Sequence, residues 1–155
     1  MRNTRSLLLL LLLSLSLLLC GCGAEAPDSS CQVDISCATA LGYGDLDPAL
    51  AELLPADGVL FSGTVEFTAG ENAYAVLSRA LTQANLHYEA AADSAYFDAV
   101  SNLYTGDCGD LSGWMYSVNG EFLMEAVNQY QPAEGDVIAL QYTCDMGADL
   151  GYVFQ

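Results

Sequence analysis

Residues 113–120 read Gly-Trp-Met-Tyr-Ser-Val-Asn-Gly, and residues 137–144 read Val-Ile-Ala-Leu-Gln-Tyr-Thr-Cys. Both stretches are rich in the β-branched and aromatic residues that favour strands. The Asn-Gly pair at 119–120 is a strong signal for a two-residue hairpin turn. The second stretch is apolar almost throughout, as expected of a strand in the middle of a sheet. The C-terminal part of the chain is therefore predicted to form a β-sheet.

One long amphipathic helix is predicted ahead of this sheet. Apolar residues recur with helical spacing at positions 73, 76, 77, 80, 81 and 84, where Asn72 or Glu71 can begin the helix and Asn85 can end it. A shorter helix is predicted over residues 47–54, with Asp47 as its N-cap and Pro48 in its first turn.

Several other segments are predicted to be extended. Residues 31–37 alternate between apolar and polar side chains, which is typical of a half-buried strand. Residues 63–68, 86–89 and 95–104 are also predicted to be extended. The order of these elements predicts an α+β fold, in which one main amphipathic helix packs on a mixed sheet and a short helix is added.

The N-terminal 22 residues predict export. Arg2 and Arg5 precede an apolar run that is too short to span a bilayer comfortably and ends in Leu-Cys-Gly-Cys. These last residues resemble a bacterial lipobox, with Cys22 as the lipidated residue; Cys20 fits less well because a bulky leucine precedes it. A plain secretory signal without lipid is the alternative. We expect residues 1–21 to be a lipoprotein signal peptide, 22–30 the lipidated cysteine and a short tether, and 31–155 one domain on the extracytoplasmic face of the membrane.

Four further cysteines remain in this domain, at positions 31, 37, 108 and 144. An even number in an oxidising compartment predicts two disulfides. On one straight strand Cys31 and Cys37 would lie about 20 Å apart, which is too far for a disulfide. They are therefore expected to pair with Cys108 and Cys144, unless their segment bends. No metal site is predicted, because the chain has no CxxC motif and a single histidine.

The chain is strongly acidic. The chain has 20 acidic and three basic side chains, no lysine, and only Arg79 as a basic residue beyond the leader. Nucleic acid is excluded as a partner because its phosphates require neutralisation by Lys or Arg. The absence of lysine, and a single histidine (His87) without a catalytic motif around it, predict that the protein is not an enzyme.

Several spaced motifs agree, in order, with a known family. Residues 112–120 (SGWMYSVNG), 129–138 (QYQPAEGDVI) and 142–145 (YTCD) resemble the transcobalamin-like C-terminal domain. Residues 65–72 (VEFTAGEN) and 102–109 (NLYTGDCG) extend the resemblance over about residues 31–155. It implies a β-grasp-like fold. It also implies cobalamin or another corrinoid as a candidate ligand, although the helical barrel that covers the other side of the corrinoid in animal carriers is missing here.

The sequence thus predicts a lipid-anchored, non-catalytic binding module for a corrinoid or another small molecule. The alternative is a structural or adhesive cell-surface domain that binds protein or glycan. The 113–120 hairpin is the expected contact surface, and the candidate ligand-binding residues are Trp114, Tyr116, Asn119 and Tyr130. Whether Trp114 is an exposed platform or a core residue is left open by the sequence.

Overall fold

The computed structural model describes residues 27–43, 45–93 and 95–153. The predicted signal peptide and Cys22 lie outside the described residues. No helix within these ranges combines the length and the hydropathy needed to cross a bilayer.

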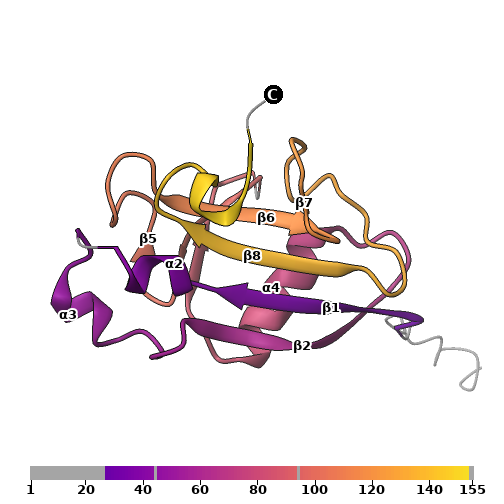
Figure 1. Ribbon diagram of the computed structural model, residues 1–155. Helices are drawn as coiled ribbons and strands as arrows, with labels where there is room; N and C mark the ends of the chain where they lie inside the picture. The colour runs from indigo at the N-terminus through magenta and orange to yellow at the C-terminus, as the bar shows by residue number, and fades with distance from the viewer. Residues whose placement is uncertain (1–26, 44, 94, 154–155) are drawn as a thin grey trace, which may run out of the picture.

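A five-stranded mixed sheet forms the body of the domain (Figure 1). Its strands stand in the order β2-β1-β8-β6-β7, and they are β1 (Ser29–Ser36), β2 (Val59–Phe67), β6 (Gly113–Val118), β7 (Glu121–Phe122) and β8 (Val137–Thr143). The β1–β8 pair is parallel and the other neighbours are antiparallel. The predicted β6–β7 hairpin is confirmed, because Asn119 and Gly120 both adopt the positive φ that a two-residue turn requires.

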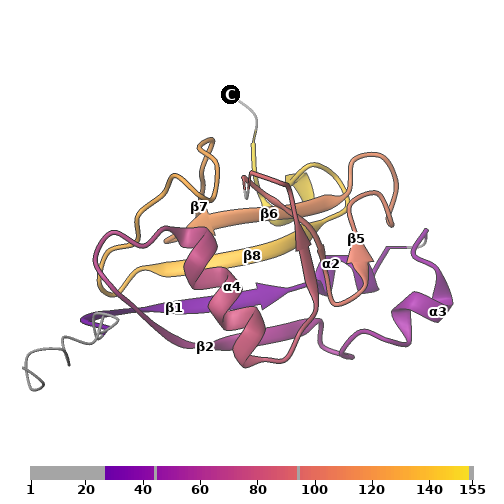
Figure 2. The ribbon, with the colours of Figure 1, turned by 180° about the vertical axis from the view of Figure 1, so that it is seen from behind.

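The helix α4 (Ala73–Gln83) crosses one face of this sheet, as Figure 2 shows from behind. Asn72 caps it by accepting a hydrogen bond from the Ala75 amide at 3.0 Å. The predicted apolar side is buried, and its residues are Ala73, Val76, Leu77, Ala80 and Leu81. Asn85 follows the helix with a left-handed φ of 55°. The predicted α+β architecture is therefore confirmed.

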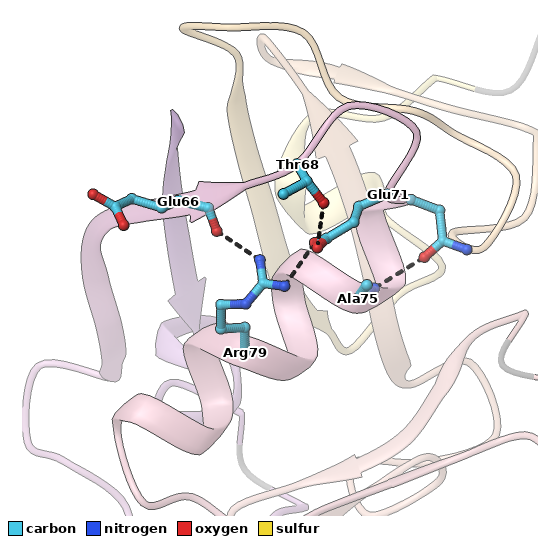
Figure 3. A network of polar contacts seen from close by, with 6 residues as sticks. Glu66, Thr68, Glu71, Ala75 and Arg79 are labelled. Atoms are coloured by element: carbon cyan, nitrogen blue, oxygen red, sulfur yellow. Dashed lines mark hydrogen bonds and ion pairs between the residues drawn. The ribbon is translucent and has the colours of Figure 1, made fainter. Parts of the chain in front are cut away.

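Arg79 ties α4 to the end of β2 (Figure 3). Its guanidinium donates to the Glu66 carbonyl at 2.6 Å and to the Glu71 carboxylate at 2.6 Å. Burial alone would raise the pKa of Glu71, but hydrogen bonds from Arg79 and Thr68 outweigh it and hold that pKa below its usual value. The only basic residue outside the leader thus has a structural partner.

A second, three-stranded antiparallel sheet packs beside the first. It contains β3 (Tyr88–Ala90), β4 (Phe97–Val100) and β5 (Leu103–Tyr104). Two aromatic side chains of the large sheet hold β5 in place. Trp114 Nε1 donates to the Leu103 carbonyl at 3.0 Å, and the Tyr142 hydroxyl donates to the Tyr104 carbonyl at 2.6 Å. The two rings meet edge to face at 5.2 Å.

The short helices depart from the predictions in detail. The helix α3 (Pro48–Ala51) begins as predicted, with Asp47 accepting from the Ala49 amide, but it ends three residues early. The helix α2 (Ala38–Leu41), which follows β1 directly, was not predicted. The 3₁₀ turn η1 (Ala148–Leu150) lies on the side of the sheet opposite to α4, visible as the yellow turn in Figure 1.

The four cysteines of the domain are buried free thiols. Cys31 and Cys37 lie near opposite ends of β1, and both side chains are buried in the core beneath the sheet. Cys108 and Cys144 instead lie close enough that each shifts the pKa of the other. The expected pairing of Cys31 and Cys37 with Cys108 and Cys144 is not formed, because all four thiols are free and Cys108 lies near Cys144.

Candidate functional site

A cavity of about 410 Å³ lies along the outer edge of β6. Four separate segments meet there: the start of β4, the loop that leads into β6 together with β6 itself, the end of β7 with the residues after it, and the end of β8 with the C-terminal segment. The lining residues are Tyr96, Phe97, Thr105, Asp110, Leu111, Ser112, Gly113, Trp114, Met115, Phe122, Leu123, Met124, Thr143, Met146 and Tyr152.

The strand pairing explains why a cavity forms at this edge. β6 pairs with β8 over its whole length, but β7 covers only Ser117 and Val118. Within the described part of the chain, residues 113–116 therefore have no strand neighbour on their outer side. Trp114 and Met115 point to opposite faces of a strand, yet both line the cavity, as expected of a site that wraps around the strand edge.

Methionine is concentrated in this cavity. Met115, Met124 and Met146 are the three methionines beyond the initiator Met1, and all three line it. Met124 is 87% exposed and Met146 is 47% exposed, so their thioethers face solvent. Met115, in β6, is half-buried. Methionine is flexible and polarizable, which suits surfaces that adapt to a ligand.

Aromatic rings complete the apolar lining. Phe122 and Tyr152 meet edge to face with centroids 5.6 Å apart. The Tyr152 hydroxyl lies 3.2 Å from the Met124 sulfur. The exposed Tyr96 contributes from the other rim. This combination of rings and thioethers offers a soft apolar surface to a ligand.

The polar groups of the lining are few. Asp110 is the one acidic side chain, and the lining has no lysine, arginine, histidine or cysteine. Two of the lining hydroxyls are already engaged: Ser112 accepts from the Cys108 amide at 3.1 Å, and Thr143 accepts from the Gly147 amide at 2.6 Å. The site therefore suits an apolar ligand that is neutral or weakly cationic.

Trp114 is the one predicted ligand-binding residue that lines this cavity. It is only 8% exposed, and its Nε1 is hydrogen-bonded within the fold. Trp114 is thus mainly a core residue with one edge in the cavity wall, and not the exposed aromatic platform that was considered from the sequence.

The other three predicted residues lie outside the cavity. The Tyr116 hydroxyl donates to the Glu125 carbonyl at 2.8 Å, and burial followed by the charge of Glu125 raises the pKa of Tyr116 to about 12. Asn119 and Tyr130 donate to the two carboxylate oxygens of Asp136, at 2.9 and 2.8 Å. The side chains of Asn119 and Tyr130 therefore tie the β6–β7 hairpin and residue 130 to the turn that directly precedes β8.

Asp136 organises this turn. It is 8% exposed, and it also accepts from the Ala133 amide at 2.8 Å. Burial would raise the pKa of Asp136, but hydrogen bonds from Ala133, Asn119 and Tyr130 hold it below its ordinary value. The network stabilises the charged form and contributes to the fold.

The acidic side chains near the cysteines do not converge on a common point. Asp107 accepts from the Tyr104 amide at 2.7 Å, and Asp149 accepts from the Cys144 amide at 2.7 Å. Across the described ranges, no three His, Cys, Asp or Glu side chains are grouped as metal ligands. These carboxylates hold loops together.

Comparison with known proteins agrees with this fold. A family described as "Domain of unknown function (DUF4430)" matches residues 70–144, just under half of the chain. No curated protein matches the sequence. Among solved structures, haptocorrin in complex with Cbi aligns with a TM-score of 0.51 at 14% identity over 81% of this chain. A "putative metal binding protein" from Ruminococcus gnavus aligns with a TM-score of 0.43 at 14% identity, over 75% of this chain and 97% of its own.

The chain spans 28% of the length of the haptocorrin chain. At 14% identity this similarity shows a shared fold, and it supports the resemblance to transcobalamin-like domains at that level. The chain is accordingly similar in fold to one part of haptocorrin and matches a family of unknown function over residues 70–144.

Proposed function

We propose that this protein is a non-catalytic binding module that takes part of a small molecule into the cavity beside β6. The observation that carries the proposal is the cavity itself, about 410 Å³ in volume and lined almost entirely by aromatic, aliphatic and thioether groups. Ligand sites in proteins are typically concave, mostly apolar and about 300–1,000 Å³ in volume. The absence of a nucleophile–base pair from its lining favours binding over catalysis.

A corrinoid is the ligand class that we favour. The fold shared with haptocorrin, which was solved with Cbi bound, supports this choice, as do the motifs at 112–120 and 142–145. A cavity of this volume takes one edge of such a macrocycle and leaves the remainder in solvent. The backbone of residues 113–116 has no strand partner on its outer side, so it can hydrogen-bond amide groups on the periphery of the ligand.

We further propose that the module works on the outer face of a bacterial membrane, anchored through a lipid on Cys22. The leader motif supports this location. The strand β1 begins at Ser29, so six residues (23–28) separate the anchor from the domain, and the distance from Cys22 to Ser29 is at most about 25 Å when they are extended. The cavity would then bind its ligand close to the membrane surface.

The open edge of β6 favours a second candidate function. An extended peptide can add to an unpaired strand edge through main-chain hydrogen bonds, with its side chains entering adjacent pockets. In that case the domain would be an adhesive module, and the cavity would receive a side chain of a protein partner instead of a small molecule.

Titration with cobinamide and with cobalamin tests the first candidate. Trp114 is the only tryptophan and lies in the cavity wall, so its fluorescence reports binding once ligand absorption has been corrected with a free tryptophan analogue. We expect saturable quenching in the micromolar range or below. Met124→Gln and Met146→Gln should weaken it, whereas Leu53→Gln, an exposed apolar residue outside the cavity lining, should not.

The result that would refute corrinoid binding is the absence of saturable quenching by either ligand at high micromolar concentration. Equal affinity in the methionine variants and the Leu53 control would instead move the site away from the cavity. Capture of an extended peptide in place of either corrinoid, with loss of capture in the same methionine variants, would support the strand-addition candidate.

A further inference from the structure

Two cysteines belong to chain segments that line the cavity. Cys108 belongs to the loop before β6, and Cys144 follows β8. Both side chains are fully or almost fully buried, at 0% and 3% exposure. The two side chains lie close enough that each shifts the pKa of the other. Two neighbouring thiols inside a core can become a disulfide.

The backbone around this pair is fixed independently of the sulfur atoms. Gly113 is paired with Thr143 in the β6–β8 ladder. The Met146 amide donates to the Leu111 carbonyl at 2.8 Å, which joins the same two segments a second time. Ser112 Oγ accepts from the Cys108 amide at 3.1 Å and so ties Cys108 to this junction. The two chain segments therefore approach each other through several contacts, and each segment carries one of the two thiols.

The other two cysteines have no such neighbour. Cys31 is the third residue of β1, and Cys37 follows its last residue. They are separated by six positions of extended strand, about 20 Å, whereas a disulfide requires Cα atoms about 4.4–6.8 Å apart. Cys37 is hydrogen-bonded to the Gly58 carbonyl at 3.5 Å. Cys31 and Cys37 are equally buried in the core and serve as matched controls.

We propose that Cys108 and Cys144 form a disulfide that braces the cavity wall, and that Cys31 and Cys37 remain thiols. The oxidant is a small or protein disulfide. One cysteine thiolate attacks its S–S bond and releases one thiolate, and the second cysteine then attacks the mixed disulfide and releases the other. Two electrons and two protons pass from the protein to the oxidant, which leaves as two thiols.

Burial decides when the bond forms. It raises the pKa of Cys108, and it raises the pKa of Cys144 to about 12, with the Cys108 hydrogen bond adding to the effect. Few thiolates are therefore present in the folded, reduced protein, and the thiolate is the reactive species. We expect oxidation to occur while the chain folds. Once formed, the buried bond should resist reductants until the protein unfolds.

The disulfide would affect the cavity because both chain segments that it joins line the cavity. The loop before β6 contributes Thr105, Asp110 and Leu111, and the segment around Cys144 contributes Thr143 and Met146. A covalent bond between them limits how far this wall can open. This consequence rests on the proposed function, whereas the existence of the bond does not.

Peptide mapping tests the pairing. Arg79 is the last basic residue of the chain, so trypsin releases residues 80–155 as one peptide, which contains Cys108 and Cys144 and no other cysteine. The full chain is refolded with reduced and oxidised glutathione, its free thiols are blocked with N-ethylmaleimide in denaturant, and it is digested. We expect a separate 80–155 peptide that carries no label, and that accepts two labels only after reduction.

Two mapping results would overturn the pairing. One is an 80–155 peptide that carries two labels before reduction, which would mean free thiols. The other is an 80–155 peptide linked to the upstream peptide until reduction, which would mean pairing with one of the four cysteines of residues 6–79. Both results are independent of any ligand and of whether a substituted protein folds.

Stability and ligand binding provide the second readout. Reduction in denaturant should lower the urea midpoint by about 1–2 M in the wild type and in Cys31→Ala, but not in Cys108→Ala. Reduction should also weaken corrinoid binding about fivefold or more. Equal affinity of the oxidised and reduced forms would overturn the bracing role. An oxidised protein with the mapped bond but no affinity would instead count against the proposed function.

Discussion

Two aromatic donors join the two sheets, and their removal should destabilise the fold in a coupled way. Trp114 and Tyr142 donate to the adjacent carbonyls of Leu103 and Tyr104 in the two-residue strand β5. Replacing either donor with phenylalanine keeps a ring in place and leaves one carbonyl without its partner; Tyr142→Phe also removes the hydrogen bond between its hydroxyl and Ser112 Oγ at 3.0 Å. A lost partner of a buried group costs about 1–3 kcal/mol. Trp114→Phe also loses ring volume, so its cost should lie toward the upper end.

The double variant distinguishes a shared role from two separate bonds. Both carbonyls belong to one short strand. Loss of the first hydrogen bond should therefore loosen β5 and reduce the contribution of the second hydrogen bond to the unfolding free energy. Residues that share such a network show interaction energies of about 0.5–3 kcal/mol. We expect the double variant to lose less unfolding free energy than the sum of the two single variants.

Urea unfolding followed by far-UV circular dichroism measures these differences without relying on tryptophan fluorescence. Tyr96→Phe, at a tyrosine that is 54% exposed, is the control and should change the unfolding free energy by less than about 0.5 kcal/mol. Single variants that behave like this control would show that the two hydrogen bonds contribute nothing to the junction. Strict additivity in the double variant would show that β5 is not a shared element.

Three further variants probe the junctions outside the cavity. Arg79→Lys should lower the unfolding free energy by about 0.5–1 kcal/mol, since a single ammonium nitrogen replaces the two guanidinium nitrogens that reach the Glu66 carbonyl and the Glu71 carboxylate; no change in urea unfolding would contradict this. Asp136 has a folded-state pKa below its ordinary value, so its contribution is present above about pH 4 and is lost as the pH falls through that lower value. The stability gap between wild type and Asp136→Asn should therefore close in acid, and a gap constant with pH would refute the linkage. Gly58 has a φ of 70°, and a Cβ there would lie 2.4 Å from the Ala38 Cα. Gly58→Ala should cost at least about 2 kcal/mol, and a wild-type thermal midpoint would contradict the clash.

The parts of the fold that depend on local pattern could be predicted from the sequence. The spacing of apolar residues located α4, and Asn72 and Asp47 cap the helices that they were expected to cap. The Asn119–Gly120 pair fixed the hairpin turn. In each case the physical cause lies within a few residues of the chain, so no knowledge of tertiary contacts was needed.

The cavity and the cysteine contact could not be predicted in the same way. Met115, Met124 and Met146 are spread over 32 positions of the chain, and only the folding of the C-terminal segment against β6 brings them together. Cys108 lies 36 positions before Cys144. The distance along a strand excluded a disulfide between Cys31 and Cys37, but it did not identify Cys144 as the neighbour of Cys108. The sequence did contain a signal for the cavity, since every methionine beyond the first follows residue 112. The spacing of these methionines alone, however, does not indicate that they line one site.

Trp114 links stability and recognition at one position, which limits what a single substitution there can show. Its ring packs against Tyr142 and its nitrogen holds β5, while one edge lines the cavity. A loss of binding in any Trp114 variant would therefore be ambiguous. Met124, 87% exposed, has little packing to lose, so its substitution should change affinity without changing the urea midpoint. Only a residue of that kind can separate the site from the scaffold that carries it.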